Sequence, residues 1–248
     1  MKDLFDLTGR VAIITGGVGF LGQQHAEILK EAGCTPILAD ICQGVDITKP
    51  ELVEKFLAIV LHEYGHVDIL INNAANNPYL GTESSRLETL TVEQWEADLA
   101  VGLTGAFICS KIIGNEMAHR KSGAIINVAS DLAVIAPDQR IYQKEGLPND
   151  KQPVKPITYS VIKAGILGLT RYLATYWADC GIRVNAISPG GMYNGQPEEF
   201  IQKLNNLIPM GRMAHLNEYQ GAILFLCSDA SSYMTGANLI IDGGRSCW

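Results

Sequence analysis

Short apolar runs alternate along the chain with longer segments in which apolar residues recur at helical spacing. The apolar runs predict strands at residues 11–14, 35–39, 67–71, 124–128, 183–187 and 237–241. The longer segments predict helices at about residues 20–32, 51–64, 91–120, 159–180 and 217–227. Strand and helix therefore alternate throughout, which is typical of an α/β fold with a doubly wound parallel sheet and helices on both faces.

Two segments depart from this alternation. The connection after the strand at 35–39 is too short for the further helix and strand that usually follow, so we expect a trimmed sheet edge. Residues 131–157 are rich in proline and in charges of both signs. A connection of this length is usually functional or mobile. Because it joins two candidate catalytic residues, we expect it to form a wall of the substrate cleft.

Length and composition favour a single domain spanning residues 1–248. The chain is 47% hydrophobic and 18% charged, which suits one well-packed core. Its net charge of -7 argues against a nucleic-acid partner or an acidic membrane surface, because a polyanion would be repelled. The N-terminus lacks the apolar run of a secretory signal, and no apolar stretch reaches the roughly 18 to 20 residues of a membrane-spanning helix. We therefore expect a soluble, cytoplasmic protein.

The six cysteines are scattered through the chain without a CxxC pair. No histidine clusters with them at metal-ligand spacing. Reduced thiols and no metal site are therefore expected, in agreement with an intracellular location.

A glycine-dense turn follows the first predicted strand and opens the first predicted helix. Gly16, Gly19 and Gly22 lie at regular spacing in it. Glycines let the backbone approach a pyrophosphate, and the helix N-terminus offers free N–H groups. A plain structural turn would carry the same three glycines, so the turn alone does not decide between the two interpretations.

Asp40 strengthens the cofactor interpretation. It stands at the end of the next predicted strand, where a carboxylate accepts hydrogen bonds from an adenosine ribose diol and repels a 2′-phosphate. NAD is therefore favoured over NADP, the alternative being that Asp40 is an exposed turn residue. Asp46 and Ile47 follow closely and are expected beside the adenine.

Three polar residues form the candidate catalytic set. Tyr159 and Lys163 are four apart at the start of a predicted helix and share one of its faces. A nearby ammonium lowers the pKa of a phenol, which suits acid/base catalysis near neutral pH. Ser130 ends a predicted strand, where its hydroxyl can donate to a substrate oxygen, although a capping serine is the alternative.

Together with other short motifs, these residues resemble the short-chain dehydrogenase/reductase family from about residue 8 to 244. The matching positions, in the order of the family, are Gly16, Gly19 and Gly22, Asn72-Asn73-Ala74-Ala75, Ser130, Tyr159 with Lys163, Asn185 with Pro189-Gly190, and Asp242-Gly243-Gly244. The resemblance implies a Rossmann-type domain and hydride transfer between a nicotinamide and an alcohol or carbonyl substrate. It also implies a homodimer or homotetramer built through the helices around 91–120 and 159–180.

The resemblance assigns roles to individual residues. Ser130 would orient the substrate oxygen, Tyr159 would exchange its proton, and Lys163 would lower the tyrosine pKa and bind the nicotinamide ribose. The residues expected to contact the cofactor are Gly16, Gly19, Phe20, Leu21, Gly22, Asp40, Asp46, Ile47, Asn73, Ala74, Ala75, Tyr159, Lys163, Pro189, Gly190 and Met192.

The chain departs from the family pattern at two places near the catalytic set. Gly102 stands where the family commonly has an asparagine that anchors a water beside the lysine, so we expect either a wider water channel or a slower proton relay. Ser130 and Tyr159 are 29 positions apart, wider than usual, because the segment 131–157 lies between them. Tyr142 is a rival for the tyrosine, but Gly146 stands where its lysine should be.

The substrate class is less defined by the sequence. Charged residues in the inserted segment (Arg140, Lys144, Lys151 and Lys155) and the polar stretch 193–196 favour a hydrophilic substrate over a steroid or an acyl chain. The region from residue 172 to the C-terminus also resembles oxidoreductases of bacterial flagellin-glycosylation and nonulosonic-acid pathways, and this resemblance implies a sugar or sugar-phosphate substrate.

Two alternative functions remain open at this point. The loss of the asparagine at Gly102 would suit a protein that senses NAD(H) without turnover. The glycine turn reads TGxxGxxG, which resembles the extended branch of the family that includes sugar-nucleotide epimerases and dehydratases. An epimerase or lyase that uses bound NAD is therefore the second alternative.

Overall fold

A six-stranded parallel sheet forms the centre of the protein. The computed structural model describes residues 3–76 and 85–248. The strands pair in the order β2-β1-β3-β4-β5-β6, and every pair is parallel. Their bounds are β1 (Val11–Thr15), β2 (Thr35–Ala39), β3 (Ile69–Asn72), β4 (Gly123–Val128), β5 (Ile182–Pro189) and β6 (Asn238–Ile241). The predicted parallel sheet is confirmed.

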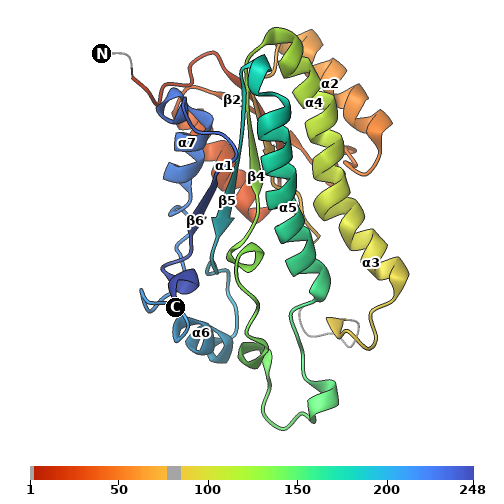
Figure 1. Cartoon of the computed structure of the whole chain (residues 1–248), viewed down its shortest axis with the longest axis vertical. Helices are drawn as coiled ribbons and strands as arrows, with labels where there is room; N and C mark the ends of the chain where they lie inside the picture. Colours follow the sequence, from red (N-terminus) through yellow and green to blue (C-terminus); the bar gives the residue numbers. More distant parts are fainter. Residues whose placement is uncertain (1–2, 77–84) are drawn as a thin grey trace.

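Helices cover both faces of this sheet (Figure 1). One face carries α1 (Phe20–Glu31) and α7 (Gln220–Cys227), and the other carries α2 (Pro50–Tyr64), α4 (Ala106–Arg120) and α5 (Ile157–Tyr176). The central strands are buried on both sides, as the fully buried β1 and β3 show. Continuous apolar strands and one-sided helices thus produce the doubly wound arrangement that their patterns predict.

The sheet is trimmed at the edge where β2 lies. After β2 the chain makes a single 3₁₀ turn, Ile41–Gln43, and enters α2 eleven residues after β2 ends, with no strand among these described residues. β2 is therefore the edge strand, as the short connection predicts. The open edge leaves Asp40, at the carboxyl end of β2, next to the glycine turn.

The predicted long helix is one continuous rod with an irregular centre. α3 (Val92–Leu99) begins at a capping box of Thr91 and Gln94, passes through a π-helical segment, Ala100–Gly105, and continues as α4. Among the described residues, this stretch (Val92–Arg120, mean hydropathy 1.4) is the one helix long and apolar enough to cross a membrane. The expectation that no segment reaches that threshold is wrong. In the fold, Ile113 and Met117 of this stretch are buried in the core beside the sheet.

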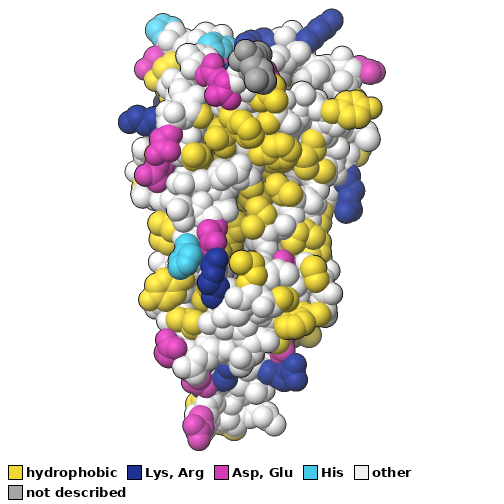
Figure 2. Space-filling model, turned by 90° about the vertical axis from the view of Figure 1, so that its left-hand side faces the viewer, with side chains coloured by type: hydrophobic (Ala, Val, Ile, Leu, Met, Phe, Trp, Pro, Cys, Tyr) yellow, Lys and Arg dark blue, Asp and Glu magenta, His cyan; other side chains and the backbone are white. Residues whose placement is uncertain are grey.

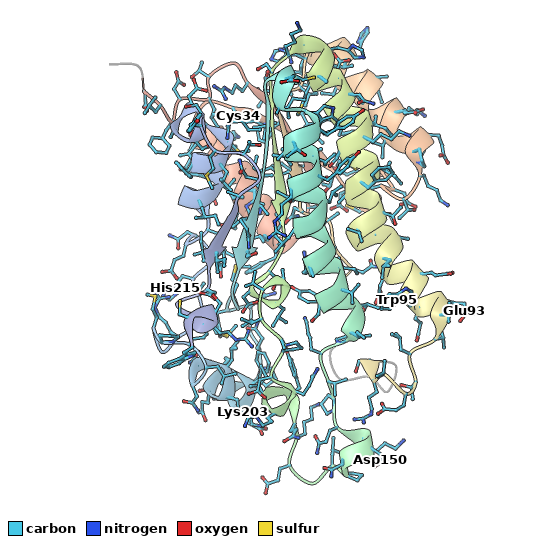
Figure 3. All side chains as sticks on the ribbon, in the orientation of Figure 1. Cys34, Glu93, Trp95, Asp150, Lys203 and His215 are labelled. Atoms are coloured by element: carbon cyan, nitrogen blue, oxygen red, sulfur yellow. The ribbon has the colours of Figure 1, made fainter. Side chains whose placement is uncertain are left out.

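One helix and the internal structure of the inserted segment were not predicted. The helix α6 (Glu198–Asn205) starts after Pro197 with two glutamates in its first turn, a signal visible in the sequence. The inserted segment contains three 3₁₀ turns, Asp131–Ala133, Gln139–Tyr142 and Asn149–Lys151. Lys203 of α6 donates to the carbonyl of Gln143 at 2.6 Å, which ties α6 to the inserted segment (Figure 3).

Candidate active site

A cleft of about 660 Å³ opens at the carboxyl ends of the strands. One end lies at the glycine turn and at Asp40, and the other lies under α6 and the inserted segment. The predicted site residues that line this cleft are Gly16, Gly19, Phe20, Leu21, Asp40, Asp46, Ile47, Asn73, Ala74, Ala75, Ser130, Tyr159, Lys163, Pro189, Gly190 and Met192. The fold therefore brings segments from the whole chain to one place.

Gly22 is the one predicted site residue that does not line the cleft. A Cβ there would collide with the carbonyl oxygen of Gly16, so Gly22 lets α1 approach the turn closely. Gly16 itself has a φ of +60°, and a Cβ on it would lie 2.8 Å from the Cα of Ala74. Among the described residues no side chain caps the N-terminus of α1. Its N–H groups and positive dipole end face the cleft, which fits the pyrophosphate of a dinucleotide.

The carboxylate of Asp40 is hydrogen-bonded to the backbone of the glycine turn. Its carboxylate accepts from the backbone N–H of Val18 and of Cys42, both at 3.2 Å. Partial burial opposes ionisation, but the Cys42 and Val18 hydrogen bonds outweigh it and hold the pKa of Asp40 below its usual value. Asp40 is therefore an anion at neutral pH at the open end of the cleft, and Asp46 lies beside it with its own carboxylate bonded to Thr48.

Asparagine side chains fix the floor of the cleft. Asn73 donates to the carbonyls of Thr15 and Gly16, both at 3.0 Å, which joins the end of β3 to the glycine turn. Asn72 points the other way and donates to Asn127 at 2.8 Å inside the core. These bonds place Ala74 and the residues after it along the cleft.

The three predicted catalytic residues converge at the inner end of the cleft. Ser130, at the end of β4, donates through its hydroxyl to Oδ1 of Asp131 at 2.8 Å. Lys163 is buried, donates to the carbonyl of Val128 at 2.7 Å, and lies 5.8 Å from the centre of the Tyr159 ring. Ser130 and Tyr159 are close enough for hydrogen bonding between their side chains. A hydroxyl, a phenol and an ammonium therefore surround one reaction position.

Burial dominates the titration of this set. Burial raises the pKa of Tyr159, and the hydrogen bond with Ser130 opposes that rise. Burial, together with the neighbouring Lys155 cation, lowers the pKa of Lys163 to about 8. The Lys163 ammonium donates to the carbonyl oxygen of Val128, and the expected lowering of the Tyr159 pKa by Lys163 stays a prediction.

A second, much smaller cavity of about 10 Å³ adjoins Lys163. Gly102 lines it, together with Asp98 and Thr158, whose hydroxyl donates to Asp98 Oδ2 at 2.6 Å. The absence of a side chain at residue 102 is thus accompanied by a pocket the size of one water molecule and not by a wide channel. Gly102 lies in the π-helical segment, and a Cβ on it would meet Cγ2 of Ile162 at 2.7 Å.

This contact predicts that Gly102→Ala destabilises the fold by about 1–3 kcal/mol, although alanine favours a helix over glycine by about 1 kcal/mol. The Ile162 methyl is fixed to a β-branched carbon and cannot swing away. Gly221→Ala is the matched control, because a Cβ on that helical glycine meets nothing within 4 Å. The midpoint of urea unfolding should fall for the first variant and stay or rise for the second. Equal shifts would show that the Ile162 contact does not restrict residue 102.

Three charged residues in the cleft were not predicted as site residues. Asp131 forms a buried salt bridge with Arg245 at 2.7 Å, their side chains being 4% and 7% exposed. Lys155 places its ammonium 3.6 Å from the centre of the Tyr159 ring. Asp131 could have been predicted from the sequence, because it directly follows Ser130. Only the fold shows that Arg245, near the C-terminus, forms a salt bridge with it.

Comparison with known proteins gives the family. Residues 39–142 match the family model described as short chain dehydrogenase, and residues 150–246 match the model described as enoyl-(acyl carrier protein) reductase. The chain is 35% identical to the NAD-dependent glycerol dehydrogenase of Listeria innocua, over 97% of this chain and 95% of the relative. It is 34% identical to the NADP-dependent mannitol dehydrogenase of Alternaria alternata, over 98% of this chain and 95% of the relative.

The fold is also similar to that of a solved dehydrogenase structure. The crystal structure of a gluconate 5-dehydrogenase from Burkholderia cenocepacia, in complex with NADP and tartrate, superposes with a TM-score of 0.84. Its sequence is 25% identical, and the match covers 99% of this chain and 98% of the other.

The chain belongs to the short-chain dehydrogenase/reductase family. It is an oxidoreductase that transfers a hydride between a nicotinamide cofactor and a polar alcohol or carbonyl substrate. A sensor without turnover and an epimerase or lyase are not favoured, because the relatives are named as dehydrogenases. Both NAD and NADP occur among them, so the family does not decide the cofactor preference.

Proposed function

We propose that the protein is an NAD-dependent dehydrogenase of a polyol or sugar-type substrate. The observation that carries this proposal is the convergence of Ser130, Tyr159 and Lys163 at one end of a cleft whose other end carries Asp40. The names of the relatives, which include glycerol, mannitol and gluconate dehydrogenases, support a polyhydroxylated substrate. The narrower assignment to flagellin-modification or nonulosonic-acid pathways rests on the resemblance of residues 172–248 alone.

In this mechanism Ser130 and Tyr159 act on the substrate oxygen, and Lys163 acts on the cofactor and on Tyr159. The nicotinamide, when bound, supplies the hydride acceptor. Ser130 Oγ holds the substrate oxygen, the phenol oxygen of Tyr159 takes the proton of the alcohol, and Lys163 binds the nicotinamide ribose and stabilises the phenolate. In the reverse direction the phenol returns the proton to the carbonyl oxygen.

The test is a panel of neutral polyols and polyol acids, assayed by absorbance at 340 nm with NAD and with NADP. Steady accumulation of NADH is expected with at least one of them. Because burial raises the pKa of Tyr159, little phenolate exists at pH 7, and oxidation should become faster as the pH rises toward 9. A product formed without net NADH would instead favour an epimerase or lyase. Absence of any turnover across the panel would contradict the proposal.

The preference for NAD is expected to depend on the charge of Asp40. Asp40→Asn keeps an oxygen that accepts from the Val18 N–H but removes the anion that repels a 2′-phosphate. The ratio of kcat/KM for NAD over NADP should fall by about tenfold or more. Asp46→Asn, at the same end of the cleft, serves as the comparison and should leave that ratio within about twofold of the native one. An unchanged ratio in Asp40→Asn would show that Asp40 does not determine the choice of cofactor.

We also propose a homodimer or homotetramer in the cytoplasm. Apolar side chains are exposed along α5 and on α4, namely Val161, Tyr172 and Tyr176 with Phe107. Figure 2 shows further hydrophobic side chains on the face that carries α7, beside the open edge strand β6. These two faces suit contacts between copies of the chain.

The mass in solution, measured by light scattering, should be two or four times 26.9 kDa, and a monomer would contradict the proposed assembly. Recovery of the protein in a membrane or secreted fraction would contradict the location.

A further inference from the structure

The inserted segment brings one cation to the reaction site. Arg140 is 81% exposed and pairs with Asp138, and the Lys144 side chain is also exposed. Lys155 is half-buried and lines the cleft. Of these three cations, Lys155 is therefore the one placed to contact a molecule bound in the cleft.

The backbone of Lys155 is held firmly in place. The side-chain amide of Gln139 pairs with both of its backbone groups, accepting from the N–H at 2.8 Å and donating to the carbonyl at 3.3 Å. Pro153 and Pro156 flank it, and both are buried. The ammonium lies over the ring of Tyr159, 3.6 Å from its centre. This arrangement fixes a positive charge beside the phenol that exchanges the proton.

Lys155 has no paired carboxylate in the part of the chain that the structure describes. Asp131, the carboxylate that acts electrostatically on Lys155, already accepts from Arg245 through Oδ2 and from the Ser130 hydroxyl and the Leu132 N–H through Oδ1. Within residues 3–76 and 85–248, no carboxylate forms a salt bridge with Lys155. Contact with the Tyr159 ring attracts the ammonium, and no oxygen among residues 3–76 and 85–248 accepts a hydrogen bond from its three N–H donors. Burial lowers the pKa of Lys155 to about 8, with the Asp131 carboxylate opposing this decrease and the Arg245 cation adding to it.

We propose that Lys155 binds a carboxylate of the substrate, so that the preferred substrate is a polyhydroxy acid and not a neutral polyol. The inference rests on the proposed function, because it names the substrate class of the same cleft. With Asp131 and Arg245 neutralising each other, and Lys163 assigned to the cofactor ribose, one positive charge remains for the substrate. A singly charged carboxylate matches it, whereas a phosphate monoester would bring a second negative charge without a second cation.

The experiment compares three ligands with the same carbon skeleton: D-gluconate, D-glucitol and D-glucitol 6-phosphate. Each is titrated into the NADH complex of the native protein by calorimetry, and kcat/KM is measured wherever turnover occurs. Lys155→Met removes the charge at similar length, Lys155→Arg restores it, and Lys144→Met removes an exposed charge from the same segment. NADH binding, followed by fluorescence, shows that each variant is folded.

The native protein and Lys144→Met should bind D-gluconate at least about tenfold more tightly than D-glucitol. Lys155→Met should lose that preference by about tenfold or more, mainly through KM where turnover is seen, and Lys155→Arg should recover part of it. A ratio unchanged in Lys155→Met, or a native preference for D-glucitol or for the phosphate, would overturn the inference. Since binding needs no turnover, a Lys155-dependent gluconate complex without NADH formation would contradict the proposed function alone.

Discussion

Tyr159→Phe should reduce hydride transfer by between about 10²- and 10⁴-fold, the range that general acid/base groups contribute. The phenol oxygen carries the proton in the proposed mechanism, and phenylalanine removes only that atom. NADH binding should change little, because the ring remains beneath the Lys155 ammonium and the glycine turn is untouched. Stopped-flow measurement of NADH formation, with NADH affinity determined by fluorescence, separates the two effects.

Tyr172→Phe is the control, since the same atom is removed from an exposed tyrosine of the same helix. It should leave the rate unchanged. Tyr142 also lines the cleft, so Tyr142→Phe tests the rival assignment. Rapid turnover in Tyr159→Phe, combined with a loss in Tyr142→Phe, would transfer the acid/base role to residue 142.

Local patterns were sufficient for the fold and for part of the cleft, while Pro189, Gly190 and Met192 were assigned to the cleft by the family resemblance. Apolar runs mark strands that are buried on both faces, and the strands of a parallel sheet end at the same edge. Residues that follow strand ends, such as Asp40 and Ser130, are therefore expected to line the same cleft without any information about the rest of the chain. The spacing of Tyr159 and Lys163 on one helix is local in the same way.

Contacts between distant segments could not be predicted. Arg245 and Asp131 are 114 positions apart, and no periodicity links a C-terminal turn to the segment after β4. Gly102 looks like a lost catalytic side chain in the sequence, whereas the structure shows a glycine required by its contact with Ile162. The four cations of the inserted segment are alike in sequence, and only the fold shows that Lys155 is the one that lines the cleft and contacts Tyr159.

Arg245→Met should destabilise the protein by about 3–5 kcal/mol, because it leaves the buried carboxylate of Asp131 without its partner. Activity should also fall, because Asp131 Oδ1 accepts a hydrogen bond from the Ser130 hydroxyl and the salt bridge holds that carboxylate in place. The midpoint of urea unfolding measures the loss of stability, and kcat/KM measures the loss of activity.

Arg140→Met provides a control at the same distance. Its pair with Asp138 is also 2.7 Å long, but the arginine is 81% exposed, so water screens the charge in both states. Its loss should cost no more than about 1 kcal/mol. The two variants thus differ in burial while the chemistry removed is the same. If the two variants destabilise the protein equally, burial does not strengthen the Asp131–Arg245 salt bridge. Ser130 would then be oriented by contacts other than this salt bridge.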